Sequence, residues 1–259
     1  MKEKFKIIFV DIDWTILDHN IRDWDYESIN ELKRIQKKGV LVYLCTARPF
    51  ASVLHTGLFD IFKPDGVVCT NGGVAFVGED LLFANIIPEE YVRQIEKICN
   101  KHHLVIELCT NKDRYFSTKP NGYVEKYFLV YREVVPIVKK YHNKNVSSIL
   151  LFAPEKYDEV LKKEFPSEMN LFRFDTYGVD VGLFRNTKGG GIKRVLEHLN
   201  IETKYAIGVG DSFDDISMFE NVGLSIAMGN GTDEAKAAAD VVSDTIGNHG
   251  LAIELKKLF

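Results

Sequence analysis

The chain lacks an excess of basic residues. Its 259 residues include 33 Lys and Arg against 37 Asp and Glu, for a formal net charge of −4. Proteins that bind DNA or RNA usually carry a basic patch or an alkaline isoelectric point, so we expect no nucleic-acid partner. No stretch approaches the ~20 consecutive apolar residues that span a bilayer, and we expect no membrane association. The apolar stretch near the start is short and is interrupted by carboxylates, which argues against a signal peptide.

Cysteine is also scarce, and its spacing does not suit a metal site. Cys45, Cys69, Cys99 and Cys109 are scattered, and the first two lie in apolar, strand-like segments. Buried free thiols are therefore the expected state. A reducing, cytoplasmic location follows as the expectation. We expect a monomer or a weak homo-oligomer, and the sequence has no internal repeat or low-complexity segment.

The most informative segment that is present is KIIFVDIDWTILD, residues 6–18. An apolar run ends abruptly in Asp11-Ile12-Asp13. Burying two like charges side by side is unfavourable unless a cation or a proton separates them. Parallel α/β sheets place their chemistry just beyond the carboxyl ends of the strands. The segment therefore predicts a metal-dependent site at the end of a buried strand.

Apolar strands and amphipathic helices alternate near both ends of the chain. This alternation predicts an α/β fold with a doubly wound parallel sheet whose two faces are covered by helices. The predicted strands are 5–10, 40–46, 66–73, 205–211 and 224–231, and the predicted helices are 25–38, 190–199, 214–222 and 251–259.

The middle of the chain has a different pattern. It carries aromatic residues but no strand that ends in acidic residues, and residues 170–184 read as a hairpin turned at Tyr177-Gly178. We predict that residues 84–184 form an inserted α+β domain. Residues 1–83 and 185–259 then form one discontinuous core.

Polar side chains follow several predicted strands of the core. In a doubly wound sheet these strand ends share one edge, so the side chains can converge on one site. Acidic clusters suit a hard, oxygen-seeking cation, and Mg²⁺ is the usual choice where phosphate is also handled. Lys188, at a helix start, can supply a positive charge for an anion. The residues at the strand ends are Asp11, Asp13, Thr46, Asn71, Asp211, Asp214 and Asp215.

Four motifs occur in an order typical of one enzyme superfamily. They are DIDWTILD at 11–18, CTAR at 45–48, Lys188-Gly189 at a helix start, and GDSFDDISM at 210–218. Together they resemble the haloacid dehalogenase superfamily, whose core is Rossmann-like. The NGG and MGNG segments, and an insert after the third strand, are similar to the Cof-like branch with a class IIB cap domain. The resemblance covers nearly the whole chain.

The resemblance implies Mg²⁺-dependent hydrolysis of a phosphomonoester through an aspartyl-phosphate. The substrate would be a small phosphorylated metabolite, such as a sugar phosphate or a phosphorylated cofactor. Asp11 would be the nucleophile and a Mg²⁺ ligand. Asp13 would protonate the leaving oxygen and then deprotonate the attacking water, while its carbonyl binds Mg²⁺. A carboxylate that attacks a phosphate dianion must overcome charge repulsion, so a cation and a lysine are needed at the same point.

The resemblance also assigns the groups that hold the phosphate. Ile12 and Ala47 would each offer a backbone N–H, and Thr46 would offer its hydroxyl. Lys188 would neutralise the phosphate and Asp11 together. The other assignments are Asp211 and Asp215 to the metal, and Asn71 and Asp214 to the phosphate or substrate.

Two positions depart from the pattern of this branch. Position 14 is usually Gly and here is Trp14. The chemistry uses the carbonyl of Asp13, so activity need not be lost, but a bulky ring can change how the cap closes. Position 214 is usually an Asn that contacts phosphate. Asp214 would repel phosphate unless it faces Mg²⁺, Lys188 or water.

Plainer interpretations stay open for several of these residues. Asp214 and Asp215 could be carboxylates that balance the dipole at a helix N-terminus. Asn71 could be only a turn residue, and Lys188 could be a solvated surface lysine. Two other functions also stay open. One is a phosphomutase, and the other is a non-catalytic regulator that binds a phosphometabolite, with Trp14 and Asp214 as signs of lost catalysis.

Overall fold

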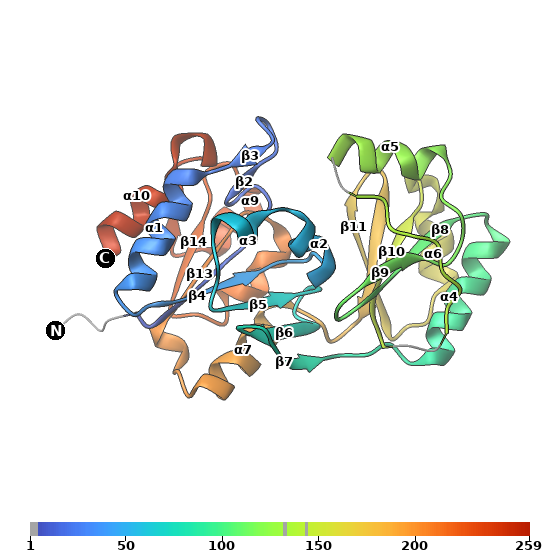
Figure 1. The fold of residues 1–259 in the computed structure, drawn as a ribbon, viewed down its shortest axis with the longest axis horizontal. Coiled ribbons are helices and arrows are strands. Elements are labelled where there is room, and N and C mark those ends of the chain that lie inside the picture. Colours follow the sequence, from blue (N-terminus) through green and yellow to red (C-terminus); the bar gives the residue numbers. More distant parts are fainter. Residues whose placement is uncertain (1–4, 132–133, 143–144) are drawn as a thin grey trace. The chain divides into compact units, whose positions relative to one another are not determined.

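The computed structural model describes residues 5–131, 134–142 and 145–259, and it divides into two compact units (Figure 1). The structure groups Arg48–Leu58 with the middle of the chain, and no pattern in the sequence indicates this grouping. The assignment of 84–184 as an inserted domain stays a prediction. The first unit comprises Met1–Ala47, Phe59–Phe83 and Thr187–Phe259, and the second comprises Arg48–Leu58 and Ala84–Asn186.

The first unit is built on an eight-stranded sheet in the order β15-β14-β13-β1-β4-β5-β6-β7. Neighbouring strands from β15 to β5 run parallel, whereas β6 is antiparallel to β5. The predicted α/β fold with a central parallel sheet is confirmed. The strands are β1 (Ile7–Val10), β4 (Leu41–Cys45), β5 (Gly66–Cys69), β6 (Val74–Val77), β7 (Asp80–Ala84), β13 (Ala206–Gly210), β14 (Leu224–Ala227) and β15 (Val241–Val242).

Strand β1 occupies the point where the connections of the sheet diverge. All four of its residues are fully buried, in keeping with their apolar sequence. β4 pairs with one side of β1 and β13 pairs with the other, so that Val10 lies opposite both Leu44 and Val209. Ligand sites in α/β sheets form beyond the carboxyl end of such a strand. The residues that follow β1 therefore lie where the fold favours a binding site.

Helices of the first unit bury the apolar stripe that their periodicity predicts. In α1, Ile29, Leu32 and Ile35 are buried, and in α7, Ile192 and Val195 join the core formed by the sheet. The predicted helix 190–199 begins two residues earlier than expected, and the predicted helix 214–222 ends three residues earlier. The helices are α1 (Tyr26–Lys37), α3 (Leu58–Ile61), α7 (Lys188–Leu199), α8 (Ile216–Phe219), α9 (Asp233–Ala238) and α10 (Gly250–Leu258), with the 3-10 helices η2 (Thr203–Tyr205), η3 (Phe213–Asp215) and η4 (Ile246–Asn248).

A short hairpin that the sequence patterns do not predict follows β1. It pairs β2 (Leu17–Asp18) with β3 (Asp23–Trp24), and each strand has only two residues. Two-residue strands are too short to show an alternating pattern, which explains why the sequence gives no sign of them. The hairpin places residues 14–24 next to the end of β1.

The second unit contains a five-stranded sheet in the order β11-β12-β10-β8-β9, and each of its neighbouring pairs is antiparallel. The predicted hairpin within 170–184 is present as β11 and β12. One apolar core joins α4 and α6 to the sheet, and a second, aromatic cluster includes Phe116, Tyr127 and Phe128. The elements are α2 (Phe50–His55), α4 (Glu89–Lys101), β8 (Val105–Thr110), β9 (Arg114–Phe116), α5 (Gly122–Tyr131), β10 (Val146–Phe152), η1 (Glu155–Tyr157), α6 (Asp158–Glu164), β11 (Met169–Asp175) and β12 (Gly178–Leu183).

Two further observations bear on the expectations from composition. All four cysteines are free and buried, as predicted. Within the part of the chain that the structure describes, none of the helices combines the length and the apolar character needed to cross a membrane.

Asp25 links the first and last helices of the first unit, which contact each other along their lengths (Figure 1). It is the N-cap of α1, where its side chain accepts hydrogen bonds from the backbone N–H and the hydroxyl of Ser28. The same carboxylate contacts Nδ1 of His249, at the start of α10, at 2.7 Å. The Ser28 hydroxyl in turn accepts from the backbone N–H of Ala252 at 3.1 Å. One carboxylate thus caps α1 and ties it to α10.

We predict that Asp25→Ala lowers the free energy of unfolding by about 2 kcal/mol, because it removes a helix cap and leaves buried donors without an acceptor. The measurement is urea denaturation followed by circular dichroism. Thr232→Ala is the matched control, because Thr232 caps α9 by accepting from Ala235 N–H. That variant should lose only about 1 kcal/mol. Equal losses in the two variants would show that the link to α10 contributes nothing.

Candidate active site

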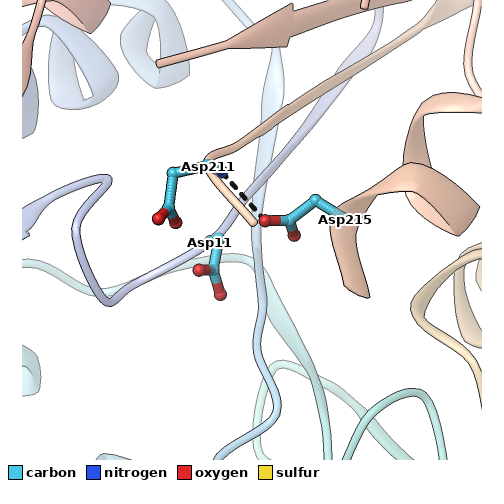
Figure 2. Close-up of side chains that lie close together, drawn as sticks. All are labelled: Asp11, Asp211 and Asp215. Atoms are coloured by element: carbon cyan, nitrogen blue, oxygen red, sulfur yellow. Dashed lines mark hydrogen bonds between the residues drawn. The ribbon is translucent and has the colours of Figure 1, made fainter. Parts of the chain in front are cut away.

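Two aspartates lie side by side where neighbouring strands end. Asp11 directly follows β1, and its backbone N–H donates to the carbonyl of Val209 on β13 at 2.9 Å. Asp211 directly follows β13. Both side chains are buried, with residue exposures of 5% for Asp11 and 7% for Asp211. The parallel pairing of β1 and β13 is the reason that residues 200 positions apart meet at one edge of the sheet (Figure 2).

Asp215 completes a cluster of three carboxylates (Figure 2). Its Oδ2 accepts hydrogen bonds from the backbone N–H groups of Asp211, at 2.9 Å, and Ser212, at 3.0 Å. The side chain also lies over Gly210, where a Cβ atom would come within 2.2 Å of the carboxyl carbon. Gly210 is therefore required at the end of β13. One oxygen atom from each of Asp11, Asp211 and Asp215 lies within 4.8 Å of the other two.

Lys188 is the cation at the centre of this cluster. It is the first residue of α7, and only 1% of it is exposed, so it is not a solvated surface lysine. Its Nζ lies 2.6 Å from Asp215 Oδ1, 3.1 Å from Asp11 Oδ1 and 3.1 Å from Asp214 Oδ2. Asp214 therefore faces Lys188, which is one of the arrangements that the sequence left open. The hydroxyl of Ser212 also donates to the Asp214 carboxylate.

Glycine residues let α7 bring Lys188 to this position. Thr187 caps the helix by accepting a hydrogen bond from the Gly190 N–H at 3.1 Å. A Cβ atom on Gly189 would lie 2.0 Å from the carbonyl oxygen of Ser217, and one on Gly191 would lie 2.7 Å from the Cα of Gly72. The helix start is thus packed against backbone on two sides. Gly189 and Gly191 therefore serve close packing in this structure.

The buried charges shift one another's protonation. Burial raises the pKa of Asp11 well above its usual value, and the neighbouring carboxylates raise it further while Lys188 opposes them. Burial and the charge of Asp215 raise the pKa of Asp211 to about 8. Burial alone would lower the pKa of Lys188, but Asp11, Asp214 and Asp215 outweigh it and raise that pKa. Three carboxylates contact the one ammonium group of Lys188, so negative charges outnumber the positive charge in this cluster.

The turn after β1 carries Asp13. Its backbone pairs with Leu17, and Trp14 N–H donates to the Leu17 carbonyl at 2.9 Å. The Asp13 side chain is 30% exposed and contacts Nε2 of His19 at 2.6 Å. The negative charge of Asp13 also contributes to the raised pKa of Asp211, so the two carboxylates lie in one electrostatic neighbourhood. Ile12, which precedes Asp13, is fully buried, and its carbonyl accepts three backbone hydrogen bonds that close the turn.

Thr46 and Asn71 come together through their backbones. Thr46 follows β4 and is buried, and its carbonyl accepts from the Asn71 N–H at 3.3 Å. Thr70, Asn71 and Gly72 all have positive φ, so the turn role that the sequence left open for Asn71 is present. Ala47 is half-buried. The roles of these residues in binding phosphate stay predictions.

Two contacts in the site were not given a role by the sequence patterns. Thr15 donates from its hydroxyl to Asp211 Oδ1 at 3.4 Å, and His19 reaches Asp13. Thr15 lies in the turn between β1 and β2, and His19 lies between β2 and β3. The first contact joins segments 196 positions apart, and the second depends on the backbone dihedral angles of a tight turn, so no local residue pattern records either.

The sequence matches the family model of haloacid dehalogenase-like hydrolases over residues 8–255. The chain belongs to this family. Among related proteins, the one named Putative phosphatase YkrA, from Bacillus subtilis, is 28% identical over 260 residues, which are 98% of this chain and 97% of the relative. A phosphoglycolate phosphatase from Methanosarcina acetivorans is 29% identical over 247 residues, which are 93% of this chain and 91% of the relative.

A solved structure agrees with this assignment. The sugar phosphatase BT4131, described as a member of HAD subclass IIB, aligns with a TM-score of 0.86 and 27% identity over 97% of this chain and 98% of its own. The predicted superfamily is therefore confirmed, and this protein is an enzyme of the hydrolase class. The roles of its individual site residues stay predictions.

We predict that Gly189→Ala lowers the free energy of unfolding of this hydrolase by at least about 2 kcal/mol, because the added methyl group overlaps the Ser217 carbonyl. It should also lower kcat by displacing Lys188. Gly190→Ala is the matched control, because Gly190 is exposed in the same helix. Alanine favours helix over glycine by about 1 kcal/mol, so the control should be no less stable than the wild type. Equal urea midpoints for the two variants would contradict the packing argument.

Proposed function

We propose that this hydrolase is a Mg²⁺-dependent phosphatase that acts on a small phosphomonoester through an aspartyl-phosphate intermediate. The observation that carries the proposal is the contact of one buried lysine with Asp11 and with two carboxylates of the 211–215 segment. Buried carboxylates held around a single cation suit a site that receives an anion together with a second cation. The phosphatase names of the relatives support the same reaction.

The residues present fit Mg²⁺. The cluster offers only oxygen donors, from Asp11, Asp211 and Asp215, at mutual distances that one ion can bridge. We propose that Asp11, Asp211 and the carbonyl of Asp13 bind the ion, with Asp215 beside them. Bound there, Mg²⁺ would supply the positive charge that offsets a phosphate dianion. Asp215 already accepts two backbone hydrogen bonds and contacts Lys188, so it also fixes the loop that carries Asp211.

The protein's own groups account for the steps of the reaction. The Asp11 carboxylate attacks phosphorus, the bond to the ester oxygen breaks, and the Asp13 carboxyl gives its proton to that oxygen. Water then attacks the aspartyl-phosphate and gives a proton to Asp13, which releases inorganic phosphate and regenerates Asp11. Lys188 stabilises the charge on Asp11 and on the phosphoryl oxygens throughout.

The remaining assignments belong to the same proposal. The backbone N–H groups of Ile12 and Ala47 and the hydroxyl of Thr46 bind the phosphoryl oxygens, with Asn71 beside them. Asp214, whose charge is offset by Lys188, is assigned to the phosphate or substrate. The second unit is the class IIB cap, and its residues select the substrate, for which a sugar phosphate or a phosphorylated cofactor is the expected class. We also propose a cytoplasmic location and a monomeric or weakly homo-oligomeric state.

We predict that Asp11→Asn lowers kcat at least about a thousand-fold, because it removes the nucleophile while keeping the side-chain volume. The melting temperature should not fall, since the change removes one negative charge from a crowded, buried cluster. Asp80→Asn is the control, because Asp80 is exposed on β7, four strands or about 19 Å from β1. It should keep wild-type activity. Substantial turnover by Asp11→Asn would favour direct attack by water.

We predict that EDTA abolishes turnover and that added Mg²⁺ restores it. Mg²⁺ should also raise the melting temperature of the wild type, because an ion that binds only the folded state stabilises it. The rise should be absent in Asp211→Asn. An equal rise in both proteins would place the ion elsewhere.

A panel of phosphorylated metabolites, assayed with Mg²⁺ for released phosphate, separates the proposal from its alternatives. Release of inorganic phosphate supports the phosphatase. Transfer of the phosphoryl group to a second hydroxyl of a sugar would identify a phosphomutase. Tight binding of phosphorylated ligands without turnover would identify a regulator.

A further inference from the structure

His19 makes a short, directed contact with the carboxyl group of Asp13. It lies between β2 and β3, and its Nε2 is 2.6 Å from Asp13 Oδ1. The side chains of both residues are partly exposed, by 21% for His19 and 30% for Asp13. At this distance the His19 Nε2–H donates a hydrogen bond to the carboxylate. The plane of the Asp13 carboxyl group is thereby fixed by a side chain from the neighbouring hairpin.

Trp14 lies against His19 in a strained backbone conformation. Its φ is +57°, a left-handed value that bulky residues rarely adopt. Its carbonyl accepts a hydrogen bond from Asn230 Nδ2 at 2.8 Å, which helps to hold this conformation. The centroids of its indole ring and of the His19 imidazole ring are 5.1 Å apart, and the two ring planes make an angle of 48°. Strained residues that the fold keeps in place are a signal of function.

We propose that His19 is a positioning residue for Asp13, and that the ring of Trp14 positions His19. The proposal rests on the proposed phosphatase function, in which the Asp13 carboxyl gives its proton to the leaving oxygen. Rotation about the terminal bond of an aspartate is soft, so a carboxyl group needs an external contact to keep one orientation. The hydrogen bond from His19 fixes Oδ1, and this also fixes the direction of Oδ2.

His19 and Trp14 orient the Asp13 carboxyl group and do not themselves transfer a proton. The proton that reaches the leaving alcohol comes from Asp13 as the phosphorus–oxygen bond breaks, and the proton on Nε2 of His19 stays in place. The indole of Trp14 limits the rotation of the imidazole ring. A glycine at position 14 would relieve the backbone strain but would remove this contact. Trp14 therefore makes the turn harder to form than glycine would, but it helps to orient the carboxyl group of Asp13 through His19.

The test compares two substrates that differ in how much they need a proton on the leaving oxygen. One is the best alkyl phosphomonoester of the metabolite panel, and the other is p-nitrophenyl phosphate, whose leaving group departs without a proton. Misplaced catalytic groups can cost up to about a hundred-fold in rate. We expect His19→Ala to lower kcat about ten-fold or more on the alkyl ester and by no more than about two-fold on p-nitrophenyl phosphate.

Three variants separate positioning from a structural role. His19→Gln should recover part of the lost rate on the alkyl ester, because its amide N–H can also donate to Asp13. His198→Ala is the matched control, because His198 is exposed in the last turn of α7, about 15 Å along the helix from Lys188. It should match the wild type on both substrates. Trp14→Gly should melt no lower than the wild type while losing rate on the alkyl ester.

A double variant tests whether Trp14 acts through His19. If it does, Trp14→Gly should cause no further loss of rate in the His19→Ala protein. Additive losses would overturn the assigned role of Trp14. The role of His19 would be overturned if both His19 variants lost kcat equally on the two substrates. It would also be overturned if neither variant lost kcat. Failure of the wild type to hydrolyse any phosphomonoester would instead refute the phosphatase function itself.

Discussion

The ion-pair cluster around Lys188 is the interaction on which the rest of the site depends. One ammonium group, almost wholly buried, contacts carboxylates of Asp11, Asp214 and Asp215. Removing the lysine from such a cluster would leave the carboxylates buried without compensation. Three carboxylates contact this one lysine, so positive charge is in deficit there. Burial and the neighbouring carboxylates raise the pKa of Asp11 and of Asp211. A site with this deficit is suited to bind a further cation together with an anionic substrate.

The fold satisfies this electrostatic requirement with backbone geometry. Parallel pairing of β1 with β13 sets two aspartates at one sheet edge, and a capped 3-10 helix returns Asp215 toward them. Gly210 leaves room for that carboxylate, and Gly189 lets α7 approach the backbone around Ser217. These glycines matter because any side chain at either position would overlap atoms that position the cluster.

In the segment after β1, backbone strain at one residue accompanies a contact with a proposed catalytic group. Trp14 occupies a left-handed conformation that glycine would adopt more easily, and its indole lies on His19. His19 in turn contacts Asp13. The departure from glycine at position 14, which could also have indicated lost catalysis, is explained in this structure by a chain of contacts that ends at the proposed acid.

The sequence by itself determined the family, the central parallel sheet and the set of residues at the strand ends. It could do so because apolar strands that end in Asp11 and Asp211 are local patterns, and parallel strands bring their ends to one edge. Only the tertiary structure decided that Asp214 faces Lys188, that His19 reaches Asp13, and that Arg48–Leu58 belongs with the second unit. Such contacts depend on turn dihedral angles and on packing between distant segments, which no local pattern of residues encodes.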